Sequence, residues 1–248
     1  MNISNFKYLL LSTLIFFSVT LCAQYREKGK SVVWKIGFNE QYEDNLNFKE
    51  RYSDEIKAIA QKSKRGSGIS KDIDVLFVGS SSIRGWRSVY QDMQPLNVVN
   101  NGFGGSTIRD ILYHYNVLVK PFNPDKIVLY VENDVIHDAG VYVDTYILFD
   151  LFRIFAHKVN SDFPLATLFI VSIKPSPSRF SLLDKQSAIN SMFKSFADKM
   201  PNIEYIDVAS QMMTPNGVDS TLFINDKLHM NAKGYQLWTS IIKPVLTL

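Results

Sequence analysis

The chain has 248 residues, 46% of them hydrophobic and 13% aromatic, and its formal net charge at pH 7 is +3. This length and composition can bury one sizeable core and predict a single main domain. The nearly balanced charge argues against a dedicated nucleic-acid binder, which usually carries a strongly basic face. Cys22 is the only cysteine, which excludes an intrachain disulfide and a cysteine-based zinc site.

Residues 1–23 have the pattern of a Sec signal peptide. Lys7 precedes an apolar run over residues 8–21, and the small residues Cys22 and Ala23 end the segment. The run is shorter than the roughly 20 apolar residues that a membrane-spanning helix needs. A lipoprotein acylated at Cys22 is the alternative, which the bulky leucine before the cysteine disfavours. We therefore expect an exported protein, periplasmic or secreted, without stable membrane insertion after cleavage.

Residues 24–70 are predicted to form an N-terminal extension, and residues 71–248 the main domain. Within the extension, apolar residues at helical spacing over 50–62 predict a peripheral helix. A glycine-containing stretch at 65–68 ends this helix.

Beyond residue 71, short apolar runs alternate with longer segments of helical periodicity. The first run, 73–79, is nearly continuously apolar, as expected for a strand that is covered on both faces. We predict further strands at 96–99, 127–131, 167–173 and 203–208, and helices at 108–119, 141–159, 182–200 and 231–245. Parallel strands joined by such crossovers form a three-layer α/β/α sandwich, whose functional groups follow the carboxyl ends of the strands.

Two segments that follow predicted strands carry groups suited to acyl transfer. Ser81 lies in a serine triplet at a strand-to-helix turn, where a side chain is open to a ligand, although such triplets more often cap a helix. Gly105 lies in the glycine-rich segment 100–107, where a backbone N–H can approach a developing oxyanion. An ordinary turn capped by Ser106 or Thr107 is an equally good interpretation of that segment.

Two further segments supply an amide and a possible base. Asn133 follows the third strand, and its neutral side chain can donate to an oxyanion, although asparagine is also a common turn former. Asp226 and His229 precede the last helix, at a spacing that lets the carboxylate hold the imidazole while the other ring nitrogen faces the serine. The remaining histidines have no partner at metal-ligand spacing and are interpreted as structural or exposed: His114, His137 and His157.

Together these segments resemble, in order and spacing, the four signature blocks of the SGNH (GDSL-like) hydrolases. The blocks are Gly79-Ser80-Ser81-Ser82, Gly105, Asn133 and Asp226-x-x-His229. The similarity runs from about residue 72 to 235. It includes residues 172–179, which look like a segment of a bacterial subgroup with a Gly-Ser-Ser-Ser motif.

The resemblance implies a flavodoxin-like parallel sheet of strand order 2-1-3-4-5 and a cofactor-free mechanism that uses no metal. Ser81 is then the nucleophile, His229 its base and Asp226 the residue that orients the base. The N–H groups of Ser81 and Gly105 and the amide of Asn133 form the oxyanion hole. Two departures from the family pattern are Ser80, where an acid is usual, and the Val131-Glu132 pair, where a glycine is often found.

The expected function is hydrolysis of a small-molecule or glycan carboxylic ester through an acyl-enzyme, with a preference for short acyl or O-acetyl groups on carbohydrate. Alternatives are a lysophospholipase- or thioesterase-like acylhydrolase, and a catalytically silent glycan-binding protein. Three residues are candidates for substrate contact: Arg84, Trp86 and Arg179. Two of them have a competing interpretation, since Trp86 could pack the following helix and Arg179 could be a solvated loop residue.

Overall fold

The computed structural model describes residues 51–62, 64, 72–135 and 144–248. The chain divides into two units, Met1–Arg51 and Tyr52–Leu248, and the helices and strands of the described residues belong to the second. The predicted signal peptide and most of the extension lie outside the described residues. Helix α3, Ser53–Lys62, falls within the range 50–62 predicted for a helix.

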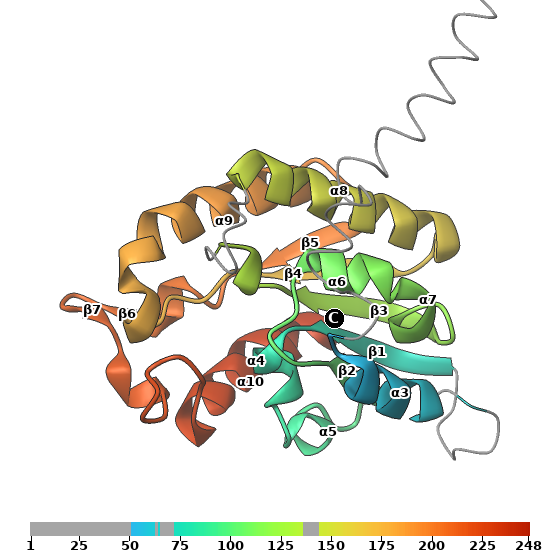
Figure 1. Ribbon diagram of the computed structural model, residues 1–248, viewed down its shortest axis with the longest axis horizontal. Coiled ribbons are helices and arrows are strands. Elements are labelled where there is room, and N and C mark those ends of the chain that lie inside the picture. Colours follow the sequence, from blue (N-terminus) through green and yellow to red (C-terminus); the bar gives the residue numbers. More distant parts are fainter. Residues whose placement is uncertain (1–50, 63, 65–71, 136–143) are drawn as a thin grey trace, which may run out of the picture. The chain divides into compact units, whose positions relative to one another are not determined.

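The centre of the second unit is a five-stranded parallel sheet with the order β2-β1-β3-β4-β5 (Figure 1). Its strands are β1 Asp72–Gly79, β2 Val98–Gly102, β3 Asn123–Tyr130, β4 Thr167–Val171 and β5 Ile203–Ile206. This arrangement confirms the predicted α/β class and the strand order 2-1-3-4-5. A short antiparallel pair, β6 Met213–Thr214 and β7 Gly217–Val218, is an element that the sequence pattern did not predict.

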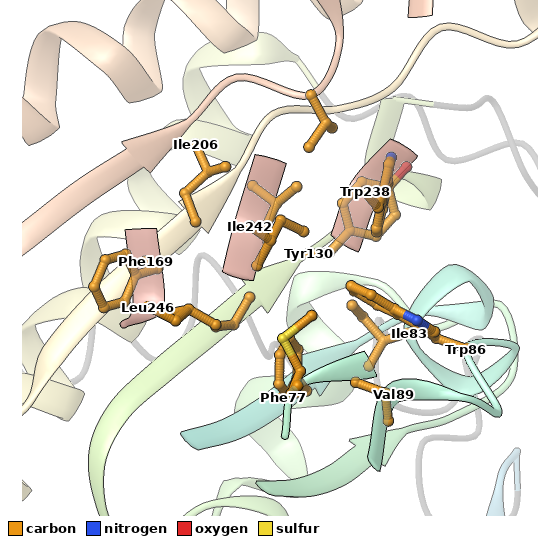
Figure 2. Close-up of a cluster of buried hydrophobic side chains, with 14 of the residues drawn as sticks. Phe77, Ile83, Trp86, Val89, Tyr130, Phe169, Ile206, Trp238, Ile242 and Leu246 are labelled. Carbon is orange, nitrogen blue, oxygen red and sulfur yellow. The ribbon is translucent and has the colours of Figure 1, made fainter. Parts of the chain in front are cut away.

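One face of the sheet is covered by α4 Ser81–Arg84, α5 Val89–Asp92 and α10 Ala232–Leu246. Because side chains alternate along a strand, Phe77 and Tyr130 point to this face. Figure 2 shows Trp238, Ile242 and Leu246 of α10 lying over the sheet as one buried stripe at helical spacing. Burial of each such side chain contributes about 1.5–3 kcal/mol, so α10 is held mainly by this stripe.

The other face is covered by α6 Ile108–Tyr113, α7 Tyr115–Leu118, α8 Thr145–Asp162 and α9 Leu183–Ala197 (Figure 1). Helices α8 and α9 pack through aromatic rings, with the centroids of Phe152 and Phe193 4.7 Å apart. Helix α3 contacts α7. With helices on both faces, the sheet is buried as a parallel sheet requires.

Two of the differences from the predicted elements concern the segments around the second strand. The single helix predicted at 108–119 is divided at His114 into α6 and α7. Strand β2 also extends to Gly102 rather than ending at residue 99, so Asn100 and Asn101 belong to the strand. Their amide nitrogens are bound inside the fold, because Asn100 donates to the carbonyl oxygen of Ile83 and Asn101 to that of Leu118, both at 2.7 Å.

Candidate active site

Three neighbouring strands end level at the carboxyl edge of the sheet. Gly79 of β1 is in register with Gly102 of β2 and with Tyr130 of β3, so the loops that follow begin side by side. A Cβ atom on Gly79 would overlap the carbonyl oxygen of Tyr130. Glycine therefore permits the close approach of β1 and β3 directly before the serine triplet.

The serine triplet separates into one accessible and two buried residues. Ser81 begins α4 and is partly exposed, whereas Ser80 and Ser82 are 1% and 2% exposed. The hydroxyl oxygen of Ser81 lies 3.0 Å from Nε2 of His229, across 148 positions of the chain. Ser81 is thus the serine that the fold presents to the imidazole.

Asp226 holds the other side of the same imidazole. Its Oδ2 lies 2.7 Å from Nδ1 of His229, and its Oδ1 accepts the N–H groups of Leu228 and His229 at 2.9 Å each. The turn is tight enough to place Lys227 in the left-handed region, at φ 57°. Partial burial raises the pKa of Asp226, but these hydrogen bonds outweigh it and lower that pKa to about 2, so the carboxylate stays ionised.

Gly105 and the side chain of Asn133 lie next to each other. A Cβ atom on Gly105 would lie 3.2 Å from Nδ2 of Asn133, and that nitrogen donates to the carbonyl oxygen of Ser106 at 3.4 Å. Asp134 fastens the two loops, because its Oδ2 accepts the N–H of Ile108 at 2.8 Å. Burial raises the pKa of Asp134 to about 7.

Behind Asn133 lies a buried cluster of charges, formed by Glu132, Lys174 and Arg179. Lys174 Nζ lies 3.0 Å from Glu132 Oε2, and Arg179 Nη1 lies 2.6 Å from Glu132 Oε1. The hydroxyl of Tyr130 donates to Glu132 Oε2 at 2.7 Å. The side chains of Glu132 and Lys174 are 4% and 0% exposed, so each buried charge is paired, as the low dielectric of the interior demands.

The surroundings of this cluster favour the ionised carboxylate of Glu132. Burial raises the pKa of Glu132, but the charges of Lys174 and Arg179 and the hydrogen bonds from Tyr130 and Lys174 bring it below its usual value. Burial acts in the opposite sense on Lys174 and lowers the pKa of its ammonium, while Glu132 opposes that change. For Tyr130, burial and the nearby carboxylate raise the pKa well above 10, which keeps the phenol a neutral donor.

The three candidates for substrate contact lie in different surroundings. Trp86 is fully buried, stacks on Tyr235 and donates its Nε1–H to Asp92 at 2.7 Å. This placement contradicts a role in lining a substrate pocket. The large apolar ring is more stable packed in the core than exposed at a cleft. Arg84 is exposed and pairs with Glu55 of α3 at 2.9 Å. Arg179 is 15% exposed and is held by the charged cluster, so it is not a solvated loop residue.

The other histidines differ in their surroundings. His114 is buried and packs edge-on against Phe103 and Tyr113, His157 is exposed on α8, and His137 is outside the described residues. Within the part of the chain that the structure describes, no group of three or more His, Cys, Asp or Glu side chains could hold a metal ion. In the same ranges, no helix is long and apolar enough to cross a membrane.

Lys174 is the main site residue that the sequence interpretation missed. Its signal was available, since Lys174 stands between two apolar residues directly after a buried strand, where a charge is unusual. Glu132 was noted only as a departure from the family pattern. The contact between them joins positions 42 residues apart, which local spacing does not reveal.

Comparisons with known proteins show which proteins the chain is similar to. Residues 66–237 match the model of the GDSL-like Lipase/Acylhydrolase family. Platelet-activating factor acetylhydrolase IB subunit alpha2 of Rattus norvegicus is 26% identical over 187 residues, which cover 71% of this chain and 75% of that protein.

Solved structures with the same fold include a lipase and an esterase. A GDSL-like lipase from Bacteroides thetaiotaomicron has a TM-score of 0.64 and 21% identity, over 82% of this chain and 98% of its own. An acetyl xylan esterase has a TM-score of 0.60 and 20% identity, over 70% of this chain and 99% of its own. At these identities the two structures bear on the fold alone.

Proposed function

The chain belongs to the GDSL-like lipase/acylhydrolase family and is an esterase-type acylhydrolase, and we propose that it is an exported serine esterase that works through an acyl-enzyme. One observation carries the mechanism. The Ser81 hydroxyl, the His229 imidazole and the Asp226 carboxylate form one continuous chain of hydrogen-bonding distances, 3.0 and 2.7 Å. This is the arrangement by which a neutral base activates a serine for attack on a carbonyl.

In the proposed reaction, Ser81 Oγ forms a bond to the ester carbonyl carbon while His229 Nε2 takes the hydroxyl proton. The carbonyl oxygen becomes an oxyanion, which accepts hydrogen bonds from the N–H groups of Ser81 and Gly105 and from Asn133 Nδ2. The tetrahedral intermediate collapses, the C–O bond to the alcohol breaks, and His229 returns the proton to the leaving alcohol. Water then attacks the acyl-enzyme by the same steps and releases the acid.

For the substrate, we favour short acyl groups, in particular O-acetyl groups on carbohydrate. The names of two proteins of similar sequence or fold refer to acetyl groups, one an acetylhydrolase and the other an acetyl xylan esterase. An enzyme that is exported also meets glycans.

The proposed export depends on residues 1–23, which lie outside the described residues. The test is the mass of the protein recovered from the periplasm or culture medium of expressing cells. Loss of about 23 N-terminal residues supports the proposal. A full-length chain retained in the cytoplasm, or a mass that includes an acylated Cys22, contradicts soluble export.

The activity is tested with p-nitrophenyl esters of increasing acyl length, together with acetylated xylo-oligosaccharides. We expect hydrolysis that is greatest for acetate, requires Ser81, and is unchanged by a metal chelator. A rate that rises with chain length favours a lysophospholipase- or thioesterase-like enzyme instead. Binding of the oligosaccharides without hydrolysis of any ester identifies a silent glycan-binding protein and overturns the proposal.

A further inference from the structure

Arg179 makes two contacts that together fix the direction of the Asn133 amide. Its Nη1 lies 2.6 Å from Glu132 Oε1, and its Nη2 donates to Asn133 Oδ1 at 3.0 Å. One guanidinium nitrogen thus pairs with the carboxylate and the other donates to the neighbouring amide, a geometry that lysine cannot reproduce.

The direction of this amide matters because the two ends of a carboxamide have opposite hydrogen-bonding character but almost the same shape. With Oδ1 bound to Arg179, Nδ2 faces Gly105 and the carbonyl oxygen of Ser106. A rotation by half a turn would place an acceptor beside the oxyanion and two donors against each other at Arg179. The guanidinium therefore selects the orientation in which Asn133 can donate.

We propose that Arg179 is a positioning residue for the oxyanion hole, which holds Asn133 with its N–H toward the reacting carbonyl. The inference rests on the proposed ester hydrolysis. It replaces the expectation that Arg179 contacts a polar substrate, and it gives Glu132 the role of holding Arg179 in place.

The cluster also carries excess positive charge beside the oxyanion. Two cationic side chains, Lys174 and Arg179, share the single carboxylate of Glu132. A hydrogen bond from a cation to an amide oxygen polarises the amide and makes its N–H a stronger donor, an effect that grows in a low dielectric. Charge that develops on the oxyanion is therefore met by an Asn133 N–H that Arg179 both orients and polarises.

The same cluster ties the oxyanion side to the loop that carries the base. Lys174 Nζ donates to the carbonyl oxygen of Leu228 at 3.0 Å, and the N–H of Ser178 donates to that of Lys227 at 3.1 Å. The imidazole of His229 follows directly in that loop. Its position relative to Asn133 is thus set through segment 172–179.

Segment 172–179 is itself anchored to the sheet and to α9. The Ser172 hydroxyl accepts the N–H groups of Val208 and Ala209 at 2.9 Å each. Asn190 of α9 bonds both the N–H and the carbonyl oxygen of Ile173, at 2.7 and 3.0 Å. These bonds give the cluster a fixed base, as positioning requires.

The test is Arg179→Gln, assayed with p-nitrophenyl acetate. The variant should fold, because Glu132 keeps both Lys174 and Tyr130 as partners. We expect kcat to fall about 10- to 100-fold with KM within about twofold of wild type, since an interaction felt mainly in the transition state lowers kcat. The matched control is Arg153→Gln, which removes an exposed arginine paired with Asp150 on α8 and should leave both constants unchanged.

A double-variant cycle separates positioning from an independent effect. In the Asn133→Ala variant, which lacks the amide, the further substitution Arg179→Gln should lower kcat by less than about threefold. The proposal is overturned if the double variant lowers kcat by the product of the two single effects. It is also overturned if Arg179→Gln raises KM with an unchanged kcat, which would show direct substrate contact. If Arg179→Gln does not fold, Arg179→Lys keeps the charge but cannot span both partners, and unchanged kcat in that variant overturns the proposal equally.

Failure of this proposal can be told from failure of the proposed function. A wild-type enzyme that hydrolyses esters through Ser81, together with fully active Arg179 variants, removes the positioning role and leaves the esterase intact. A wild-type protein that hydrolyses no ester removes both.

Discussion

The two sides of the site differ in how they meet the solvent. On the side proposed to transfer protons, the side chains of His229 and Asp226 are 38% and 42% exposed. On the oxyanion side, the carboxylate of Glu132 and the ammonium of Lys174 are 4% and 0% exposed. Both sides contain closely paired side chains, yet one is open and the other is enclosed.

The difference follows from what each side does. A base that exchanges protons with alcohol and water must be reachable, and Asp226 stays ionised because it accepts two backbone N–H groups and the imidazole. An oxyanion donor must instead keep one direction, which a low-dielectric cluster enforces strongly. The open side therefore relies on local hydrogen bonds, and the enclosed side on paired buried charges.

The largest expected effect is on the open side, at the nucleophile. Ser81→Ala should lower kcat by about 10⁴-fold or more, as loss of a triad nucleophile does. Ser80→Ala and Ser82→Ala are the controls and should retain measurable activity, because both hydroxyls are buried. A fluorophosphonate probe and peptide mapping supply a second measurement, and a label on Ser80 or Ser82 would mean that the nucleophile is misassigned.

On the enclosed side, Asn133→Ala should lower kcat by about 10²–10³-fold, because it removes one oxyanion donor. The thermal unfolding temperature should stay close to that of wild type, since Asn133 is partly exposed and Asp134 still fastens the loops. Full activity of this variant would identify Asn133 as a turn residue only.

The pH dependence should belong to the open side. We expect kcat/KM to fall about tenfold per pH unit at acid pH, because protonated His229 cannot act as a base. Asp226, with a pKa of about 2, remains ionised over that range. Asp226→Asn should lower kcat, since the carboxylate that orients the imidazole is gone. Arg179→Gln should leave the shape of the pH profile unchanged, and an altered profile in that variant would break the separation of the two sides.

A smaller effect concerns the stability of the enclosed side. The pKa of Asp134 is raised to about 7 by burial, so the folded state binds a proton that the unfolded chain releases near pH 4. The stabilisation of the folded state by this proton is fully present below about pH 4 and is lost as the pH rises to about 7. Asp134→Asn keeps an acceptor for the Ile108 N–H and should raise the free energy of unfolding at pH 8 by about 1–3 kcal/mol relative to wild type. Urea unfolding at pH 4 and pH 8 measures the free energy of unfolding of the variant and of wild type. A difference between the two proteins that is equal at both pH values would contradict the titration of Asp134.

Much of the fold could be predicted because the strands are short apolar runs separated by longer segments of helical periodicity. The strand order, however, came from the resemblance to a family and not from periodicity. The end of β2 was misplaced because Asn100 and Asn101 look like loop residues until the carbonyl groups that bind them are known. Burial of a polar side chain depends on partners distant in sequence, and a pattern of spacing does not contain them.

The site shows the same limit. Asp226 and His229 are three residues apart, so their contact is visible in the sequence. Lys174 and Glu132 are far apart, and a lysine without a known partner is usually exposed. Trp86 shows the converse, since an aromatic residue close to the nucleophile fits a cleft or a core equally well until its neighbours are known.

The anchored segment 172–179 has a consequence for local opening of the molecule. Because Lys174 and Ser178 bind the carbonyl groups of Leu228 and Lys227, the segment and the loop of the base cannot separate without breaking both bonds. They should behave as one cooperative unit in hydrogen exchange, in which the amide protons of Ser178 and His229 share one opening free energy.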